Sequence, residues 1–399
     1  MTTPLFVGRV PWSLTFPERL SVPINRAAIT PPTGTAAELM RAALEKPFGF
    51  EPLRRALTPG DRITVVLDPL LPQLPALLGE LFAHLASAGV SSETVSILTP
   101  PGTAASWIEG LTVTGFRSEV HDPADAKNLG YLASTVAGRR VYLNRAIIDG
   151  DFVIVLAGRG YDPRLGYTGA ETALFPAFSN VEVRDEFAGQ VVLSAPNAAE
   201  PGPIQAEAIE IVKLLGLPFF IQVIEGEGDA IQDVIAGLPE SSPEGIRRQD
   251  ARWRGTVTDD ADTAIAVISG DPSRVTFLDL AKAALCAARV VRKGGRIAVL
   301  TEASPELGDG ARLLRAIDGP EDAKKLLGRL KPSDWVGCRL WAFAAKSRSL
   351  FLASGYPHEV VEELFATSIR TPNEVQRLID GGGSVLFIPD AHKTMLTPG

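Results

Sequence analysis

Thiol and imidazole side chains are scarce in this sequence, which has two cysteines and four histidines among 399 residues. Cys286 and Cys338 lie far apart, so a disulfide framework and a pair of closely spaced thiolate metal ligands are both excluded. No two histidines are close enough in the sequence to indicate a local metal site or acid–base pair. We interpret each as a surface or helix-end residue; they are His84, His121, His358 and His392.

Positive charge and long apolar runs are also limited. The 39 Lys and Arg residues are outnumbered by 47 Asp and Glu residues, and the net charge of -8 argues against a nucleic acid or an anionic membrane as partner. No segment reaches the roughly 18 to 20 uncharged residues of a bilayer-spanning helix, and the start of the chain lacks the features of a secretory signal. We therefore expect a folded cytoplasmic protein, and the sequence leaves its oligomeric state open.

Short apolar runs alternate with helix-like segments along most of the chain, which is typical of α/β folds with mainly parallel sheets. The first series of expected strands is 62–67, 94–98, 151–156 and 219–223. The expected helices of this series are 35–46, 75–88 and 203–215. Thr35 and Glu38 have the spacing of a capping box, which predicts that the first of these helices begins there.

A polar, turn-prone stretch at 239–261 contains a further expected helix, 243–253, and precedes a second series. This series has expected strands at 263–269, 296–300, 349–353 and 384–388, and expected helices at 277–290, 334–346 and from Thr371 onward. We predict a first α/β domain of residues 1–258 and a second of residues 259–384. The sequence leaves two places for the last strand, about 385–399, which packs either with the second domain or back on the first.

The glycine-rich segment from Gly158 to Thr172 is the densest functional candidate. It follows a strong strand, so it lies at a carboxyl strand end, where open α/β sheets place their ligands. An ordinary glycine-rich crossover loop is an equally good interpretation. Asp68 also ends a strand, although an Asp-Pro pair is more often a turn former. The common phosphate-loop, dinucleotide, nucleophile-elbow and zinc-helix motifs are absent.

Several short sequence segments occur in a characteristic order along the chain. They are Ala42 to Gly49 followed by Pro52-Leu53, the strand ending at Asp68, Ile97 to Gly102, Gly166 to Thr172 with Pro176 beyond, Asp334-Trp335 through Ser354, and Val385 to Asp390. In this order they resemble segments of the nickel-dependent lactate racemase family. The resemblance implies two α/β domains with mainly parallel sheets that face across a cleft. It also implies a nickel pincer nucleotide, tethered through a thioamide to a lysine, that removes and returns a hydride at a 2-hydroxy acid.

The residues that hold the cofactor in that family are replaced here. The resemblance places the tethering lysine on Thr172 and the arginine beside it on Glu171, and no histidine occurs near Phe187, where the family has its nickel ligand. A threonine hydroxyl has no amine nitrogen for the thioamide. We therefore expect no metal and no cofactor, with the nucleotide present only if it binds without its lysine. The matching positions for cofactor contact are Gly166, Gly169 and Thr172.

The residues that handle the substrate are replaced as well. The two acid–base histidines of the family fall on Ala104 and Asp162, and the carboxylate-binding arginine falls on Leu71, which cannot grip a carboxylate. Asp68 and the pocket lysine, Lys282, are kept. Racemisation by the family mechanism is therefore not expected.

These replacements make the expected site more acidic. If Asp68, Asp162 and Glu171 converge, they favour a hard cation such as magnesium or calcium, or a cationic ligand. The alternative is a structural ion-pair network in which basic residues neutralise them; these are Arg159, Arg164 and Lys282.

The first hypothesis is a lactate racemase-like protein with a degenerate site that binds a small ligand or a partner in the interdomain cleft. The second is an active isomerase, epimerase or other enzyme of this family, with Asp68 or Asp162 as base and Lys282 as electrostatic partner. A ligand or divalent cation held by those side chains favours the second, and a cleft plugged by Leu71, Tyr161 and Phe175 opposes it. The third is a structural or interaction protein, recognisable by a large exposed apolar patch.

Overall fold

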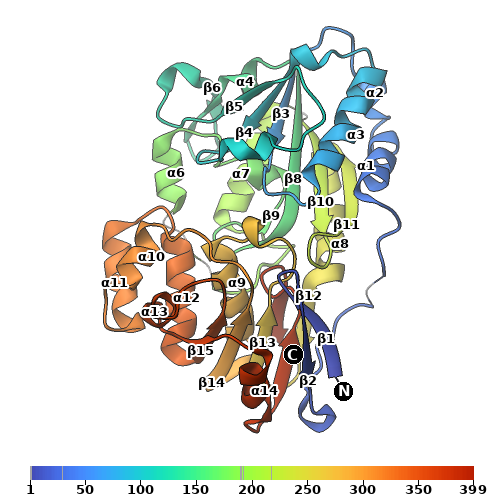
Figure 1. The fold of residues 1–399 in the computed structure, drawn as a ribbon. Coiled ribbons are helices and arrows are strands. Elements are labelled where there is room, and N and C mark those ends of the chain that lie inside the picture. Colours follow the sequence, from blue (N-terminus) through green and yellow to red (C-terminus); the bar gives the residue numbers. More distant parts are fainter. Residues whose placement is uncertain (1, 29, 189–190, 192, 217) are drawn as a thin grey trace. The chain divides into compact units, whose positions relative to one another are not determined.

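The computed structural model describes residues 2–28, 30–188, 191, 193–216 and 218–399. The fold is α/β with mainly parallel sheets, as predicted, and the chain divides into two compact units (Figure 1). Unit 1 consists of residues 1–29, 227–229 and 251–399, and unit 2 of residues 30–226 and 230–250. No helix in the described ranges is long and apolar enough to cross a membrane.

Unit 2 is built on one sheet in the order β11-β10-β8-β3-β4-β5. Its strands are β3 (Ile63–Leu67), β4 (Val95–Thr99), β5 (Arg117–Val120), β8 (Phe152–Asp162), β10 (Phe219–Glu225) and β11 (Ile231–Gly237). Neighbouring strands are parallel except for β10 and β11, and the short β9 (Gly166–Thr168) pairs antiparallel with β8. The chain runs outward from β3 to β5 and then returns to place β8 on the other side of β3. The strand order therefore reverses between β3 and β8, which is the switch point where such sheets bind ligands.

Both faces of this sheet are covered, because every residue of β3 is buried. Ile63 and Val65 face the core under α1 (Ala36–Glu45) and α3 (Leu74–Ser87), whereas Val66 faces the opposite core under α5 (Ala170–Leu174) and α7 (Pro203–Leu215). The capping box predicted at Thr35 and Glu38 is present at the start of α1. The other elements of unit 2 are α2 (Leu53–Ala56), the hairpin of β6 (Leu129–Ser134) and β7 (Arg140–Asn144), α4 (Arg145–Asp149) and α6 (Val181–Ala188).

Unit 1 is built on a fully parallel sheet in the order β16-β15-β14-β13-β17. Its strands are β13 (Ala261–Val267), β14 (Val291–Leu300), β15 (Ser349–Ala353), β16 (Ala366–Ile369) and β17 (Val385–Ile388). Its helices are α9 (Phe277–Ala288), α10 (Asp309–Leu314), α11 (Pro320–Leu330), α12 (Trp335–Ser347), α13 (His358–Glu363) and α14 (Pro372–Asp380). The strand order reverses between β13 and β17, so this sheet has a switch point of its own.

The N-terminal residues belong to unit 1, which differs from the predicted domain of residues 1–258. β1 (Thr2–Val7) and β2 (Val10–Thr15) form a hairpin whose Leu5 and Leu14 join the core of the unit 1 sheet. Gly8 also forms a parallel bridge with Ser269. The boundary lies at residues 250 and 251, within α8 (Ser242–Trp253), rather than at 258 and 259. Local periodicity does not reveal which distant strands pair, so the sequence misassigned these residues.

The last residues of the chain also stay in unit 1. β17 pairs with β13, and β18 (Met395–Pro398) pairs with β12 (Arg254–Val257), which lies within the predicted first domain of residues 1–258. The last strand therefore packs back on residues of that predicted domain, although all of these strands belong to unit 1. The predicted helix 243–253 corresponds to α8, and the predicted strand 349–353 has the bounds of β15.

A buried ion pair lies where β8 meets α5 in unit 2. The side chains of Arg159 and Glu171 are 1% and 6% exposed, and Arg159 Nη2 donates to Glu171 Oε1 at 3.2 Å. Arg159 Nε donates to Gln222 Oε1 at 2.5 Å. A Cβ atom at Gly169 would overlap the Arg159 guanidinium, and one at Gly245 would overlap Gln222 Oε1 and Arg159 Nε. Burial alone would raise the pKa of Glu171, but the adjacent guanidinium and its hydrogen bonds outweigh burial and lower that pKa.

We expect Arg159→Met and Glu171→Met each to lower the free energy of unfolding by about 3 kcal/mol, because each leaves one buried charge without its partner. The double substitution should cost less than the sum of the two, since it removes both charges together. Urea unfolding followed by far-UV circular dichroism measures all three variants. Strictly additive losses would show that the two side chains do not act as a pair.

Candidate functional site

Asp68 lies at the switch point of the unit 2 sheet, beside the glycine-rich segment. Its backbone N–H donates to Leu156 O at 2.9 Å, and its Oδ1 accepts from Leu70 N at 3.0 Å. A Cβ atom at Gly158 would lie 3.5 Å from Asp68 Oδ2 and 3.4 Å from a methyl carbon of Leu71. Asp68 and Gly158 are therefore neighbours at the carboxyl edge, as the sequence predicted for strand ends. Leu71 is buried in the core.

Asp162 is committed to the turn between β8 and β9. Its Oδ1 accepts from the backbone N–H groups of Arg164 at 2.7 Å and Leu165 at 3.2 Å. Arg164 Nη2 lies 3.1 Å from Asp162 Oδ2, and this nearby carboxylate raises the pKa of Arg164. Asp162 thus holds a turn through its own neighbours, which agrees with the ion-pair alternative for this residue.

The three residues matched to cofactor contacts also have local partners. Thr172 is buried, and its hydroxyl accepts from Gly169 N at 3.0 Å and donates to Gly169 O at 3.2 Å in the first turn of α5. The space beside Gly169 is filled by the Arg159 guanidinium. Gly166 has a φ of +78° at the start of β9, a conformation that favours glycine.

Sequence reasoning missed Asp250, which joins two strands of this region. Tyr161 Oη donates to Asp250 Oδ1 at 2.8 Å, and Tyr167 Oη donates to Asp250 Oδ2 at 2.7 Å. Asp250 comes from α8, far along the chain, and no local pattern connects it with these tyrosines. Tyr161 is buried, as are Leu71 and Phe175.

The residues of unit 2 do not fit a tethered nickel pincer nucleotide. Thr172 offers no amine, and Phe187, at the expected nickel-ligand position, packs edge-on against Phe175 with a centroid separation of 5.7 Å. His121 is buried with Nε2 2.9 Å from Ser179 O, and burial lowers its pKa. His84 Nε2 accepts from Arg54 N at 2.9 Å. Both rings are therefore buried and bonded within the fold. His84 lies in the last turn of α3, as predicted for a helix-end residue, whereas His121 is neither at the surface nor in a helix.

Carboxylates do not gather into a metal site in the part of the chain that the structure describes. No group of three or more His, Cys, Asp and Glu residues there is placed to hold a metal ion. The acidic residues of unit 2 pair instead with arginines, Glu171 with Arg159 and Asp162 with Arg164.

Lys282 lies in unit 1, in a cluster of charged groups at the start of α9. Its Nζ is 3.7 Å from Asp279 Oδ1, and Asp279 forms the capping box of α9 with Thr276. His392 faces the same groups, and its buried Nδ1 atom has no hydrogen-bond partner. Burial lowers the pKa of His392 to about 4, with help from Lys393 and against the opposing charge of Asp279. The ring is therefore neutral at neutral pH, and no sequence pattern connects it with Lys282.

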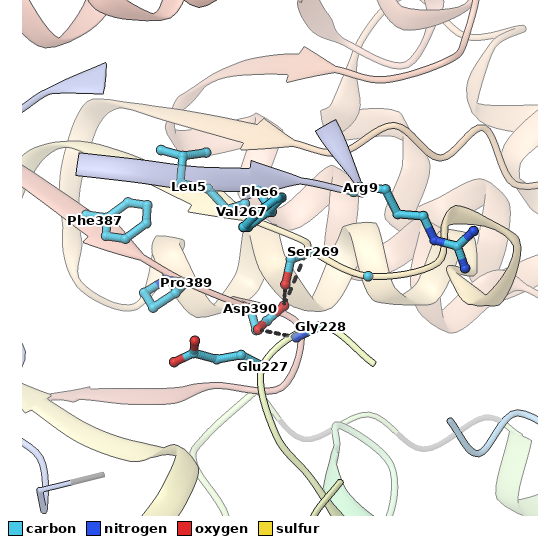
Figure 2. A pocket seen from close by; sticks show the side chains of 12 residues that line it. Leu5, Phe6, Arg9, Glu227, Gly228, Val267, Ser269, Phe387, Pro389 and Asp390 are labelled. Atoms are coloured by element: carbon cyan, nitrogen blue, oxygen red, sulfur yellow. Dashed lines mark hydrogen bonds between the residues drawn. The ribbon is translucent and has the colours of Figure 1, made fainter. Parts of the chain in front are cut away.

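A pocket of about 590 Å³ lies at the switch point of the unit 1 sheet (Figure 2). Val267 and Ser269 line it from the carboxyl end of β13, and Phe387 and Asp390 line it from β17 and the turn beyond. The remaining walls come from the β1–β2 hairpin and the segment that joins unit 1 at residues 227–229; they include Leu5, Phe6, Gly8, Arg9, Glu227 and Gly228. Sequence reasoning missed this pocket, because its walls come from four distant segments.

Comparisons with known proteins agree with the resemblance seen in the sequence. Residues 7–186 match the lactate racemase N-terminal domain family. The lactate racemase apoprotein from Thermoanaerobacterium thermosaccharolyticum has a similar structure, with a TM-score of 0.78 and 18% identity over 99% of this chain and 100% of that one. A protein from Thermotoga maritima is also similar, with a TM-score of 0.68 and 12% identity over 93% of this chain and 100% of that one. No curated protein sequence matches the chain. Residues 7–186 are therefore similar to the lactate racemase N-terminal domain family, and the chain as a whole has the fold of the lactate racemase apoprotein.

Proposed function

We propose that this chain is a lactate racemase-fold protein that does not tether nickel pincer nucleotide and instead binds a small molecule without a covalent link. The observation that carries the proposal is the Thr172 hydroxyl, which is buried and bonded to both Gly169 N and Gly169 O in the first turn of α5. A hydroxyl at this position supplies no nitrogen for a thioamide.

The surrounding residues support the same proposal. The positions that resemble the two acid–base histidines hold Ala104 and Asp162, and Asp162 is held by Arg164. The position of the carboxylate-binding arginine holds Leu71, which packs in the core. These residues supply neither the base nor the acid that racemisation by paired proton transfer requires. We place the protein in the cytoplasm, where the two buried free cysteines fit a reducing compartment.

We expect the protein to have its bare sequence mass when it is co-produced with the enzymes that make nickel pincer nucleotide. Denaturing mass spectrometry should show no added mass, and metal analysis should show less than about one tenth of a nickel ion per chain, because no amine is available at residue 172. A lysine-bearing lactate racemase produced in the same cells is the positive control. Near-stoichiometric nickel with retained cofactor mass would overturn the proposal.

Thr172→Val tests whether the hydroxyl serves the fold. This nearly isosteric change removes both bonds to Gly169, and we expect the free energy of unfolding to fall by about 1 kcal/mol while the mass and nickel content stay as in the parent protein. Thr172→Ser keeps the hydroxyl and should lose less. Equal stability of all three proteins in urea unfolding would mean that the hydroxyl does not hold the first turn of α5.

A second candidate function is an enzyme with repurposed residues, and the cluster around Lys282 favours it. A neutral imidazole at His392 is a proton acceptor at neutral pH, and Lys282 beside Asp279 is an electrostatic partner for an anion formed in a reaction. Of the carboxylates proposed as base from the sequence, Asp68 lies at the unit 2 switch point, and Asp162 is engaged by Arg164. His392 is thus a further candidate base in addition to Asp68.

The neutral state of His392 predicts a pH dependence of stability. The ordinary pKa of histidine is about 6.5, and the folded protein lowers it to about 4. Between these values the unfolded chain takes up a proton that the folded chain does not, so the free energy of unfolding falls as the pH is lowered. The loss should be about 2 kcal/mol by about pH 5. The charged groups that face the ring are Asp279, Lys282, Asp390 and Lys393.

Urea unfolding at about pH 7.5 and about pH 5, with and without His392→Gln, measures this loss. Tryptophan fluorescence is a suitable signal, since four of the five tryptophans lie in unit 1; they are Trp12, Trp253, Trp335 and Trp341. The variant should lose less stability than the parent protein over this range. An identical pH dependence of the two proteins would mean that His392 is already protonated, or exposed, when folded.

A further inference from the structure

The pocket of unit 1 lies where a parallel sheet most often holds a ligand. After β13 the chain continues to β14 on one side of it, and it later crosses back to add β17 on the other side of β13. The connections at the carboxyl ends of β13 and β17 therefore run in opposite directions. Val267 and Ser269 reach the pocket from β13, and Phe387 and Asp390 from β17. The volume of about 590 Å³ is within the range of small-molecule sites.

One part of the pocket is apolar. Leu5, Phe6 and Val267 form one wall, and Phe387 and Pro389 lie on another (Figure 2). Phe6 is 59% exposed although it belongs to a strand whose neighbouring residues enter the core. An exposed aromatic ring at the wall of a cavity is available to a flat or aliphatic ligand.

The polar groups beside this apolar part are hydrogen-bond acceptors. The buried Asp390 carboxylate accepts from Ser269 N at 3.1 Å, from Ser269 Oγ at 2.6 Å and from Gly228 N at 3.0 Å. Because the Ser269 hydroxyl donates to Asp390, it presents lone pairs to the cavity. Glu227 has a side chain that is 65% exposed, and Arg252 Nη2 contacts only its Oε1, at 3.2 Å. Within the described chain, Glu227 Oε2 receives no hydrogen bond.

Two cationic side chains and one backbone N–H around the cavity have partners within unit 1. Arg9 Nη2 is 2.8 Å from Asp271 Oδ2, and Lys393 Nζ donates to Gly228 O at 2.6 Å. The backbone N–H of Gly270 donates to Gly8 O at 3.0 Å. Beside the Asp390 carboxylate and Glu227 Oε2, a carboxylate or phosphate ligand would meet acceptors of its own kind, whereas a ligand with N–H donors would meet partners.

We propose that this pocket binds a small primary ammonium compound with an apolar body, with the ammonium group at Glu227 and the body against Phe6 and Phe387. The proposal rests on the non-covalent ligand binding proposed above and names its place and chemical class. An ammonium group donates three hydrogen bonds, which suits Glu227 Oε2 and the Ser269 hydroxyl. The aromatic rings of Phe6 and Phe387 suit the apolar body and attract a nearby cation.

A series of three probes with the same ring tests the charge requirement. Benzylamine is a cation near neutral pH, benzyl alcohol is neutral and benzoate is an anion. Isothermal titration should give benzylamine a Kd of about 1 mM, as expected for a ligand of this size, and the other two probes at least about tenfold weaker binding. Benzoate or benzyl alcohol bound as tightly as benzylamine would overturn the proposed class.

Variants locate the binding. Glu227→Gln keeps the size of the side chain and should weaken benzylamine binding at least about fivefold, and Phe387→Leu should weaken all probes together. Glu240→Gln is the matched control, because Glu240 is an exposed glutamate of unit 2 outside the pocket. Near-ultraviolet circular dichroism checks that each variant remains folded. Equal benzylamine affinity in the Glu227 and Glu240 variants would overturn the site.

The titration and the cofactor assay give separate answers. A bare mass without nickel, together with no benzylamine binding, would leave the absence of a tether standing and overturn the ammonium site. Tethered nickel cofactor together with binding weakened by Glu227→Gln would overturn the proposed loss of the tether and keep the ammonium site.

Discussion

The buried pair of Arg159 and Glu171 determines what the carboxyl edge of the unit 2 sheet can accommodate. Removing two charges from water is costly, so both side chains must keep their partners, and the guanidinium must stay beside Gly169. That requirement fixes the start of α5, where Thr172 closes the first turn on Gly169. The segment that resembles a cofactor-binding loop is thereby filled by side chains of its own unit. Glu171 and Asp162 each have a local arginine partner, which explains how these buried carboxylates are tolerated there.

The switch point of the unit 2 sheet is packed by side chains, whereas that of the unit 1 sheet holds a pocket, and the neighbouring residues explain the difference. In unit 2, Leu71 packs beside Gly158, while in unit 1 the β1–β2 hairpin forms a separate wall that leaves space beside β13. Glycines permit this arrangement, since Gly8, Gly228 and Gly270 all have positive φ values at the pocket. A side chain at Gly270 would press on Asp229, so the backbone segments come close together only without one. The hollow is thus produced by backbone packing, and apolar side chains from the hairpin line it.

Sequence patterns predicted what depends on neighbours along the chain. The cap at Thr35, the helix start at Thr371, the strand that became β3 and the strand end at Asp68 follow from short-range spacing, and the structure contains all of them. The β1–β2 hairpin, the partner of Tyr161 and the pocket at β13 depend on contacts between distant segments. No periodicity encodes such contacts, and His392 likewise gains its lowered pKa only from the groups folded around it. The family resemblance supplied the fold for the same reason, because it carries information about long-range pairing that a single sequence lacks.

The side chains around Thr172 form a coupled set, so a lysine at this position alone would not fit into unit 2. A lysine in place of Thr172 would break the bonds to Gly169 and add a third charge beside Arg159 and Glu171 in a buried region. With Glu171 already paired to Arg159, the new ammonium group would have no carboxylate of its own, and burial would lower its pKa toward the neutral amine. Replacing Glu171 alone would leave Arg159 unpaired instead. A lysine at position 172 therefore requires joint changes at the ion pair and at the helix start, and each intermediate carries the cost of an uncompensated buried charge.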